Sequence, residues 1–284
     1  MEEDAQRVNA GVPFIELNES PLAPGASPVR IRYRESGRGA PLIFLHGGWG
    51  YEVFPFGSQA AALDGEYRII IPDRSGYGES TPIDRFEPGF HRAAAVETLA
   101  IVDALGVDDV VVWGHSDGAV IATLMALRAP ARIRGIILEA THLSGRKPSS
   151  RAFFETIAAD PDSVGIRVGG VLARDHGEGW RNLLASHSRV WLRLADEQRP
   201  NSDFYDGRLG DLQLPTLIVH GARDPRTEPG ELDEIRARLA HAEAHVFPDA
   251  GHSPHSEAAT ASRVTEIAAE FLSRIVDAAP SARI

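Results

Sequence analysis

Short apolar segments alternate with longer helical patterns along most of the chain. Residues 29–35 alternate apolar and polar side chains, as in a half-exposed strand, whereas residues 41–45 are continuously apolar, as in a strand covered on both faces. The same criteria predict strands at 67–71, 109–113, 133–138, 216–220 and 244–247, and helices at 90–105, 119–127, 231–239 and 256–275. Strands that alternate with helices indicate an α/β fold, with a mostly parallel central sheet and helices on both faces.

This alternation stops between residues 142 and 212. The segment contains helical pieces that are interrupted by prolines and glycines, together with two tryptophans and several leucines. An inserted helical cap is the simplest explanation of this pattern. We therefore predict a core formed by residues 1–142 and 211–284, and a helical cap formed by residues 143–210.

Composition narrows the classes of function. The chain of 284 residues has a formal net charge of −11 and no cysteine, which excludes disulfides, thiol catalysis and cysteine-based zinc sites. Nucleic-acid binders usually present a concentrated basic face, and a membrane helix needs roughly 20 apolar residues. The acidic net charge argues against a nucleic-acid binder, and the longest apolar stretches are too short for a membrane helix. The acidic start of the chain differs from a secretory signal. We expect a cytoplasmic protein without nucleic-acid or membrane partners. Lys147, the only lysine, is expected in a polar loop, so Schiff-base catalysis is set aside.

A nucleophile motif follows the strand predicted at 109–113. Residues 114–118 read Gly-His-Ser-Asp-Gly, which fits the Gly-x-Ser-x-Gly pattern of a strained strand-to-helix turn with small flanking residues. The turn places Ser116 at the start of a helix, where partial positive charge and free N–H groups stabilise a developing oxyanion. Ser116 is therefore the candidate nucleophile.

A serine hydroxyl needs a base within hydrogen-bond reach, and the base needs an orienting acid. Asp224 follows the strand predicted at 216–220, and His252 follows the strand predicted at 244–247. Both positions lie just beyond the C-terminal ends of strands, where open α/β sheets assemble their sites. The order serine, aspartate, histidine is the one expected when this kind of turn carries the nucleophile. We predict that Ser116, Asp224 and His252 form a catalytic triad.

Together these motifs resemble those of the α/β-hydrolase superfamily over nearly the whole chain. The resemblance rests on His-Gly-Gly-Trp at 46–49, Asp-Arg-Ser-Gly-Tyr-Gly at 73–78, the serine turn, and Gly-His at 251–252. It implies that backbone N–H groups of Gly48, Trp49 and Asp117 form the oxyanion hole, and that the cap is a lid. The Gly-x-Ser-Asp-Gly turn is also similar to that of valacyclovir hydrolase-like enzymes, which implies that the Asp117 carboxylate recognises the amino group of an ester. Stabilisation of the helix by this carboxylate is the alternative.

Aromatic side chains supply further candidates for substrate contact, namely Trp49, Trp180 and Trp191, although aromatic residues of a lid more often pack against the interior. Other polar residues near the motifs are expected to have structural roles. We expect His115 to pack beneath the serine turn, Arg74 to fix a turn, and His255 to begin a helix. Glu139 stands where some haloalkane dehalogenases carry their acid, but Asp224 already supplies one.

The expected reaction is acyl transfer to water. Serine at position 116 disfavours dehalogenases and epoxide hydrolases, which need a carboxylate nucleophile. Trp-Gly-Tyr at 49–51 follows the glycine pair where proline iminopeptidases usually show Pro-Gly, so peptidase activity is less expected. We expect cleavage of a small carboxylic ester or a lactone without cofactor or metal. Carbon–carbon bond hydrolases of the meta-cleavage type share the same triad, and a ligand-binding receptor with little turnover is an alternative of another class. The expected partner is a small-molecule substrate, and the sequence allows a homodimer.

Overall fold

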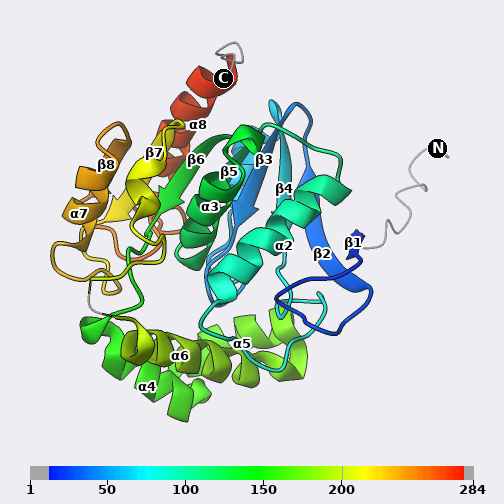
Figure 1. The fold of residues 1–284 in the computed structure, drawn as a ribbon, viewed down its shortest axis with the longest axis vertical. Coiled ribbons are helices and arrows are strands. Elements are labelled where there is room, and N and C mark those ends of the chain that lie inside the picture. Colours follow the sequence, from blue (N-terminus) through cyan, green and yellow to red (C-terminus); the bar gives the residue numbers. More distant parts are fainter. Residues whose placement is uncertain (1–12, 200, 278–284) are drawn as a thin grey trace, which may run out of the picture.

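The computed structural model describes residues 13–199 and 201–277, and a mixed sheet of eight strands forms its centre (Figure 1). The strand order is β1-β2-β4-β3-β5-β6-β7-β8. Antiparallel pairs join β1 to β2 and β2 to β4, and all other neighbours are parallel. The strands are β1 Phe14–Leu17, β2 Val29–Ser36, β3 Ala40–Leu45, β4 Tyr67–Pro72, β5 Val110–His115, β6 Ile133–Glu139, β7 Thr216–Gly221 and β8 Glu243–Phe247.

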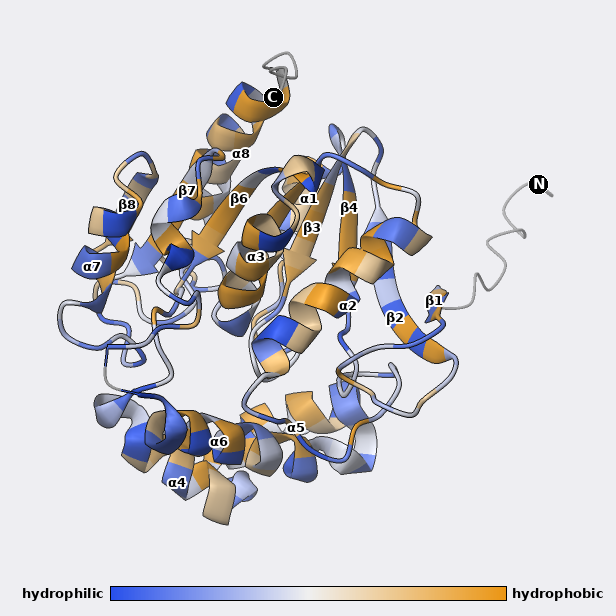
Figure 2. Ribbon diagram, in the orientation of Figure 1, coloured by the Kyte–Doolittle hydropathy of each residue, from blue (hydrophilic) through white to orange (hydrophobic). Residues whose placement is uncertain are grey.

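Helices cover both faces of this sheet. In β3, Ile43 and Leu45 pack in the cluster that contains α2 and α3, whereas Leu42 and Phe44 pack in the cluster that contains α1 and α8. This two-sided burial explains why the strand is continuously apolar, since each buried side chain of this size contributes about 1.5–3 kcal/mol. Figure 2 shows the same hydrophobic character along the central strands. The helices are α1 Gly57–Leu63, α2 Phe90–Ala104, α3 Asp117–Arg128, α7 Glu231–Arg238 and α8 Ala261–Asp277.

The seven strands and four helices predicted from the sequence are all present, and the α/β fold class is confirmed. One boundary is wrong, because α8 begins at Ala261 and not at residue 256. The carboxylate of Glu257 accepts the backbone N–H groups of Gly251 and Ser253, so the residues before α8 form a loop around that side chain. The short elements β1 and α1 were not predicted, because neither is long enough to establish a period.

Every element between β6 and β7 is helical. Figure 1 shows α4, α5 and α6 side by side at the end of the sheet toward which the parallel strands point. We call residues 148–211 the helical layer. Its elements are α4 Arg151–Ala159, α5 Gly165–His176 and α6 Trp180–Glu197, with short 3-10 turns at Pro148–Ser150, Pro161–Val164, Gly177–Gly179 and Arg208–Asp211.

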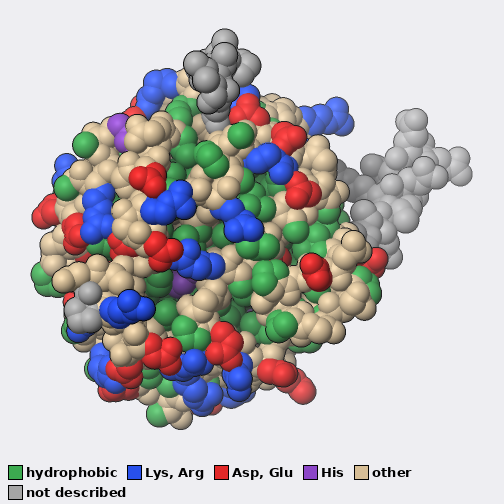
Figure 3. Space-filling model, viewed as in Figure 1, with side chains coloured by type: hydrophobic (Ala, Val, Ile, Leu, Met, Phe, Trp, Pro, Cys, Tyr) green, Lys and Arg blue, Asp and Glu red, His purple; other side chains and the backbone are tan. Residues whose placement is uncertain are grey.

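The surface is charged and mixed in sign. On the face shown in Figure 3, acidic and basic side chains lie interspersed, including over the helical layer. Within residues 13–199 and 201–277, no helix combines the length and the apolar character that are needed to cross a membrane.

Candidate active site

Ser116 lies at the sharp turn between β5 and α3. Its backbone has φ 55° and ψ −119°, a conformation that residues other than glycine rarely adopt. The two glycines of the motif make this turn sterically accessible. A Cβ atom at Gly114 would lie 2.1 Å from the carbonyl oxygen of Gly118, and one at Gly118 would lie 2.1 Å from the carbonyl oxygen of Leu45. Small residues at both positions therefore allow the turn to present the serine.

The structure brings Ser116, His252 and Asp224 together from three separate loops. Nε2 of His252 lies 3.0 Å from Oγ of Ser116, and Nδ1 of His252 lies 2.9 Å from both carboxylate oxygens of Asp224. Burial raises the pKa of Asp224, but hydrogen bonds from His252 and from the backbone N–H of Arg226 outweigh it and hold that pKa well below its ordinary value. The ionised carboxylate fixes the proton of His252 on Nδ1, which leaves the lone pair of Nε2 directed at the serine hydroxyl.

A second histidine supports the loop that carries His252. His115 is buried beneath the turn, as expected, and its Nε2 donates to the carbonyl oxygen of His252 at 3.0 Å. Burial lowers the pKa of His115 to about 3, so the ring is neutral near pH 7. A neutral donor can hold the loop without adding a positive charge beside the candidate base.

The loop expected to supply the oxyanion hole is fixed through its carbonyl groups. Arg74 donates from Nη2 to the carbonyl oxygen of Gly47 at 3.0 Å, and the Tyr77 hydroxyl donates to the carbonyl oxygen of Gly48 at 3.2 Å. In a trans peptide, the C=O and N–H groups point in opposite directions. The N–H groups of Gly48 and Trp49 are therefore turned away from Arg74 and Tyr77, and both residues line the cavity beside Ser116. The expectation that Arg74 fixes a turn is confirmed.

The carboxylate of Asp117 is bound by two buried histidines. Its Oδ1 lies 2.9 Å from Nε2 of His91, and its Oδ2 lies 2.7 Å from Nε2 of His187. Both oxygens are thus occupied, and Asp117 is not among the residues that line the cavity. The structure does not support the expectation that this side chain recognises a substrate amino group, because histidines of two other helices, α2 and α6, already bind its two oxygens.

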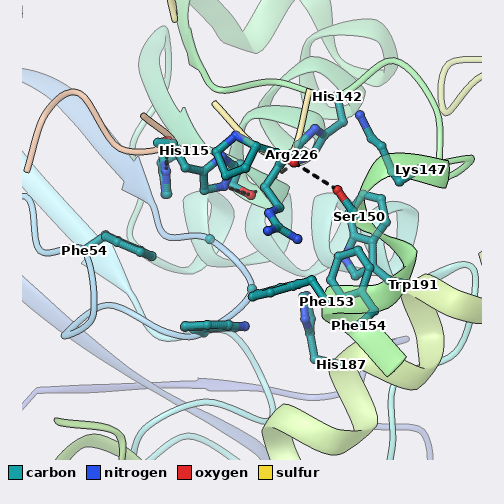
Figure 4. A pocket seen from close by; sticks show the side chains of 16 residues that line it. Phe54, His115, His142, Lys147, Ser150, Phe153, Phe154, His187, Trp191 and Arg226 are labelled. Carbon is teal, nitrogen blue, oxygen red and sulfur yellow. Dashed lines mark hydrogen bonds between the residues drawn. The ribbon is translucent and has the colours of Figure 1, made fainter. Parts of the chain in front are cut away.

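Ser116 lines a cavity whose walls are predominantly apolar. Figure 4 shows several aromatic side chains around it. Trp49 and Trp191, two of the tryptophans proposed for substrate contact, line it. Trp180 does not, because its ring packs beside α5, where a Cβ atom at Gly169 would lie 3.3 Å from it. The aromatic side chains around the cavity are Trp49, Phe54, Phe153, Phe154 and Trp191.

His142 is a second imidazole beside the nucleophile that sequence reasoning missed. Its Nε2 lies 3.4 Å from Oγ of Ser116, and its ring is stacked near that of His252 at an interplanar angle of 13°. Burial, and then the charge of Lys147, hold the pKa of His142 well below its ordinary value, so the ring is neutral. Nδ1 of His142 is buried and has no hydrogen-bond partner within the described residues, whereas Nδ1 of His252 is held by a carboxylate. This difference identifies His252 as the better base.

Lys147 lies in the loop between β6 and the 3-10 turn at Pro148–Ser150, as expected, but its side chain is buried. Its side chain is only 3% exposed and forms an ion pair with Glu231, whose own side chain is 6% exposed. The partner comes from the start of α7, more than eighty residues further along the chain, so no local pattern could reveal it.

Two more expectations concern Glu139 and His255. His255 does not begin a helix but is fully buried, and its Nδ1 lies 2.8 Å from Oε1 of Glu139. Glu139 also accepts a hydrogen bond from the indole N–H of Trp113. The pair is therefore part of the core beneath the site, and Glu139 is not the acid of His252.

Comparisons with known proteins identify the family and the fold. Residues 42–263 match the model of the alpha/beta hydrolase family. The chain is 29% identical over 266 residues to a 2-hydroxy-6-oxo-6-phenylhexa-2,4-dienoate hydrolase of Burkholderia cepacia, covering 84% of this chain and 89% of that protein. It is 24% identical over 234 residues to the serine hydrolase BPHL of Mus musculus, covering 80% and 78%. A thermophilic esterase from Thermogutta terrifontis superposes with a TM-score of 0.71 at 21% identity, covering 93% and 99%.

The chain therefore belongs to the alpha/beta hydrolase family, and it is a hydrolase of this type. The resemblance inferred from the sequence motifs is confirmed.

Proposed function

We propose that the protein is a serine hydrolase that cleaves a small carboxylic ester, or a lactone, through an acyl-enzyme intermediate. The observation that carries this proposal is the hydrogen-bonded chain from Asp224 through His252 to Ser116 at a strained turn. The serine Oγ attacks the carbonyl carbon while its proton passes to Nε2 of His252, which then protonates the leaving alcohol. Water, deprotonated by the same Nε2, attacks the acyl group, releases the acid and restores the serine.

The negatively charged oxygen of the tetrahedral intermediate must be stabilised by hydrogen-bond donors. The N–H groups of Gly48, Trp49 and Asp117 are our candidates, because the carbonyl contacts of the loop orient the first two and the first turn of α3 leaves the third without a helical partner. A single donor of this kind contributes about 10²- to 10³-fold in rate.

The helical layer supplies much of the cavity wall, through Phe153 and Phe154 of α4 and His187 and Trp191 of α6. We propose that it acts as a lid that sets the shape of the substrate. Its aromatic side chains favour an acyl or alcohol group with substantial apolar surface.

The test is turnover of p-nitrophenyl acetate, butyrate and octanoate, together with an amino-acid ester, by wild type and Ser116→Ala. We expect multiple turnover of at least one ester in wild type and none in the variant. Covalent labelling of wild type by a fluorophosphonate, without turnover of any ester, would favour a ligand-binding receptor. Equal ester turnover in wild type and Ser116→Ala would refute the serine mechanism.

Carbon–carbon bond hydrolysis is the second candidate, because the Burkholderia cepacia relative is a hydrolase of 2-hydroxy-6-oxo-6-phenylhexa-2,4-dienoate. The same compound serves as the test. Ser116-dependent hydrolysis of it at a rate above that of every ester would support this candidate, and failure to hydrolyse it would remove it.

A further inference from the structure

The charged side chains that line the cavity are basic, although the chain as a whole is acidic. The chain carries a net charge of −11, yet no aspartate or glutamate is among the described residues that line the cavity. Two cationic side chains, Lys147 and Arg226, do line it. An apolar cavity that contains cations and no carboxylate favours an anionic group of a ligand, provided that at least one cation is unpaired.

Lys147 is paired. Both carboxylate oxygens of Glu231 accept hydrogen bonds from its ammonium group, and this pair is almost completely buried. The charge of Lys147 is thereby neutralised within the protein. Lys147 therefore provides no unpaired positive charge for an anionic ligand.

Arg226 is not paired in this way. Within residues 13–199 and 201–277, its guanidinium forms no ion pair, and its Nη1 is buried without a hydrogen-bond partner. The nearby carboxylate of Asp224 is already held by His252. Burial lowers the pKa of Arg226, and the charge of Asp224 opposes that effect. An unpaired buried donor on a charged group carries a desolvation cost that an anionic ligand removes.

The position of this guanidinium is fixed. The backbone N–H of Arg226 donates to Oδ1 of Asp224 at 2.8 Å, and Cζ lies 3.6 Å from the ring centroid of Phe153. Phe153 in turn is stacked on Trp49, with centroids 5.8 Å apart. Figure 4 shows the Arg226 side chain extending toward Phe153 within the cavity. A guanidinium that stacks through its face keeps its N–H edge free for a planar anion.

We propose that Arg226 binds a carboxylate of the substrate, so that the protein prefers esters that carry a free carboxylate beyond the ester group. This inference rests on the proposed esterase function and narrows its substrate class. A carboxylate is planar, accepts two parallel N–H bonds, and brings a single charge into a cavity with aromatic walls. The anchor lies two residues beyond Asp224, so binding of the anion at Arg226 positions the substrate close to the triad.

The test compares esters that differ only in a terminal carboxylate or methyl group. One pair, monomethyl adipate and methyl hexanoate, places this group on the acyl side; the other, 4-acetoxybutanoate and butyl acetate, places it on the alcohol side. We expect wild type to show at least about tenfold higher kcat/KM for the carboxylate member of one pair. In Arg226→Met, kcat/KM for that ester falls about 10- to 100-fold, mainly through KM, and most of the preference over the neutral ester is lost.

Arg223→Met is the matched control, because Arg223 lies in the same loop but is 68% exposed and pairs with Asp249 at the surface. It should keep the preference of wild type. Arg226→Lys keeps the charge without the planar edge and should fall between wild type and Arg226→Met. Labelling of each variant by a fluorophosphonate shows that its site is folded.

Two outcomes separate this inference from the proposed function. Ser116-dependent hydrolysis with no preference for either carboxylate ester, or a preference that Arg226→Met retains, overturns the role of Arg226 and leaves the serine mechanism standing. Absence of both ester hydrolysis and labelling in wild type overturns the proposed function, and with it the inference.

Discussion

Asp117, the residue after the candidate nucleophile, joins three helices through one carboxylate. It belongs to α3, and its partners His91 and His187 belong to α2 and to α6 of the helical layer. The side chain is 1% exposed. We predict that Asp117→Asn, which keeps the size of the side chain and removes its charge, destabilises the protein without selective loss of any one substrate.

The magnitude follows from the two hydrogen bonds. A hydrogen bond to a charged group contributes about 1.5–3 kcal/mol, and a neutral one contributes about 0.5–1.5 kcal/mol. Asparagine can keep two neutral bonds to the same imidazoles, so the loss is the difference, about 2–3 kcal/mol in the free energy of unfolding at pH 7.

The loss should depend on pH. Burial raises the pKa of Asp117, but His187 and His91 outweigh it and hold this pKa well below its ordinary value. A carboxylate with a lowered pKa in the folded state contributes its full stability above the unfolded pKa of about 3.9. That contribution is lost as the pH falls through the folded pKa. Asparagine does not titrate, so the difference between wild type and Asp117→Asn should shrink below about pH 4.

Urea unfolding of both proteins at pH 7 and at pH 3.5 measures this difference. Asp162→Asn is the matched control, because Asp162 makes an equally short pair with Arg181 but is 57% exposed, and solvent-exposed ion pairs contribute little to stability. Equal stability of Asp117→Asn and Asp162→Asn would refute the reasoning. A turnover defect confined to an amino-acid ester would show instead that the carboxylate recognises substrate.

Three further predictions concern the nucleophile and its neighbours. His252→Ala should lower kcat about 10⁴-fold or more, and His142→Ala less than about 10²-fold, because only His252 has a carboxylate partner; comparable losses in steady-state assays would mean that both rings act as bases. Asp224→Asn should lower kcat about 10⁴-fold with little change in KM, since the amide favours the wrong tautomer of the histidine; a change confined to KM would argue against this role. Gly118→Ala should destabilise the protein by about 1–3 kcal/mol, whereas Gly57→Ala, which has open space around it, should change stability by less than about 1 kcal/mol; thermal unfolding that ranks them equally would contradict the steric account of the turn.

The sequence predicts best those parts of the fold that depend on the pattern of side chains within one short segment. Buried parallel strands such as β3 and β5 are continuously apolar, because both of their faces are covered. The positions of Ser116, Asp224 and His252 could also be predicted from the sequence. Each follows the carboxyl end of a strand, and in a parallel sheet these ends meet at one edge.

Residues whose role depends on distant partners could not be predicted in the same way. His142 resembles any loop histidine until the fold places it beside Ser116, and Lys147 looks exposed until α7 supplies Glu231. Arg226 is one arginine among many in the sequence. Its lack of a partner is visible only when the surrounding side chains are in place.

The central claim is that Ser116 is a nucleophile activated by His252, and covalent labelling tests it most directly. Wild type, Ser116→Ala and Ser150→Ala are treated with a fluorophosphonate, and the modified peptide is identified by mass spectrometry; Ser150 is another serine that lines the cavity. The account predicts one adduct on Ser116 in wild type and in Ser150→Ala, and none in Ser116→Ala. An unlabelled wild type, or an adduct that persists in Ser116→Ala, would contradict it.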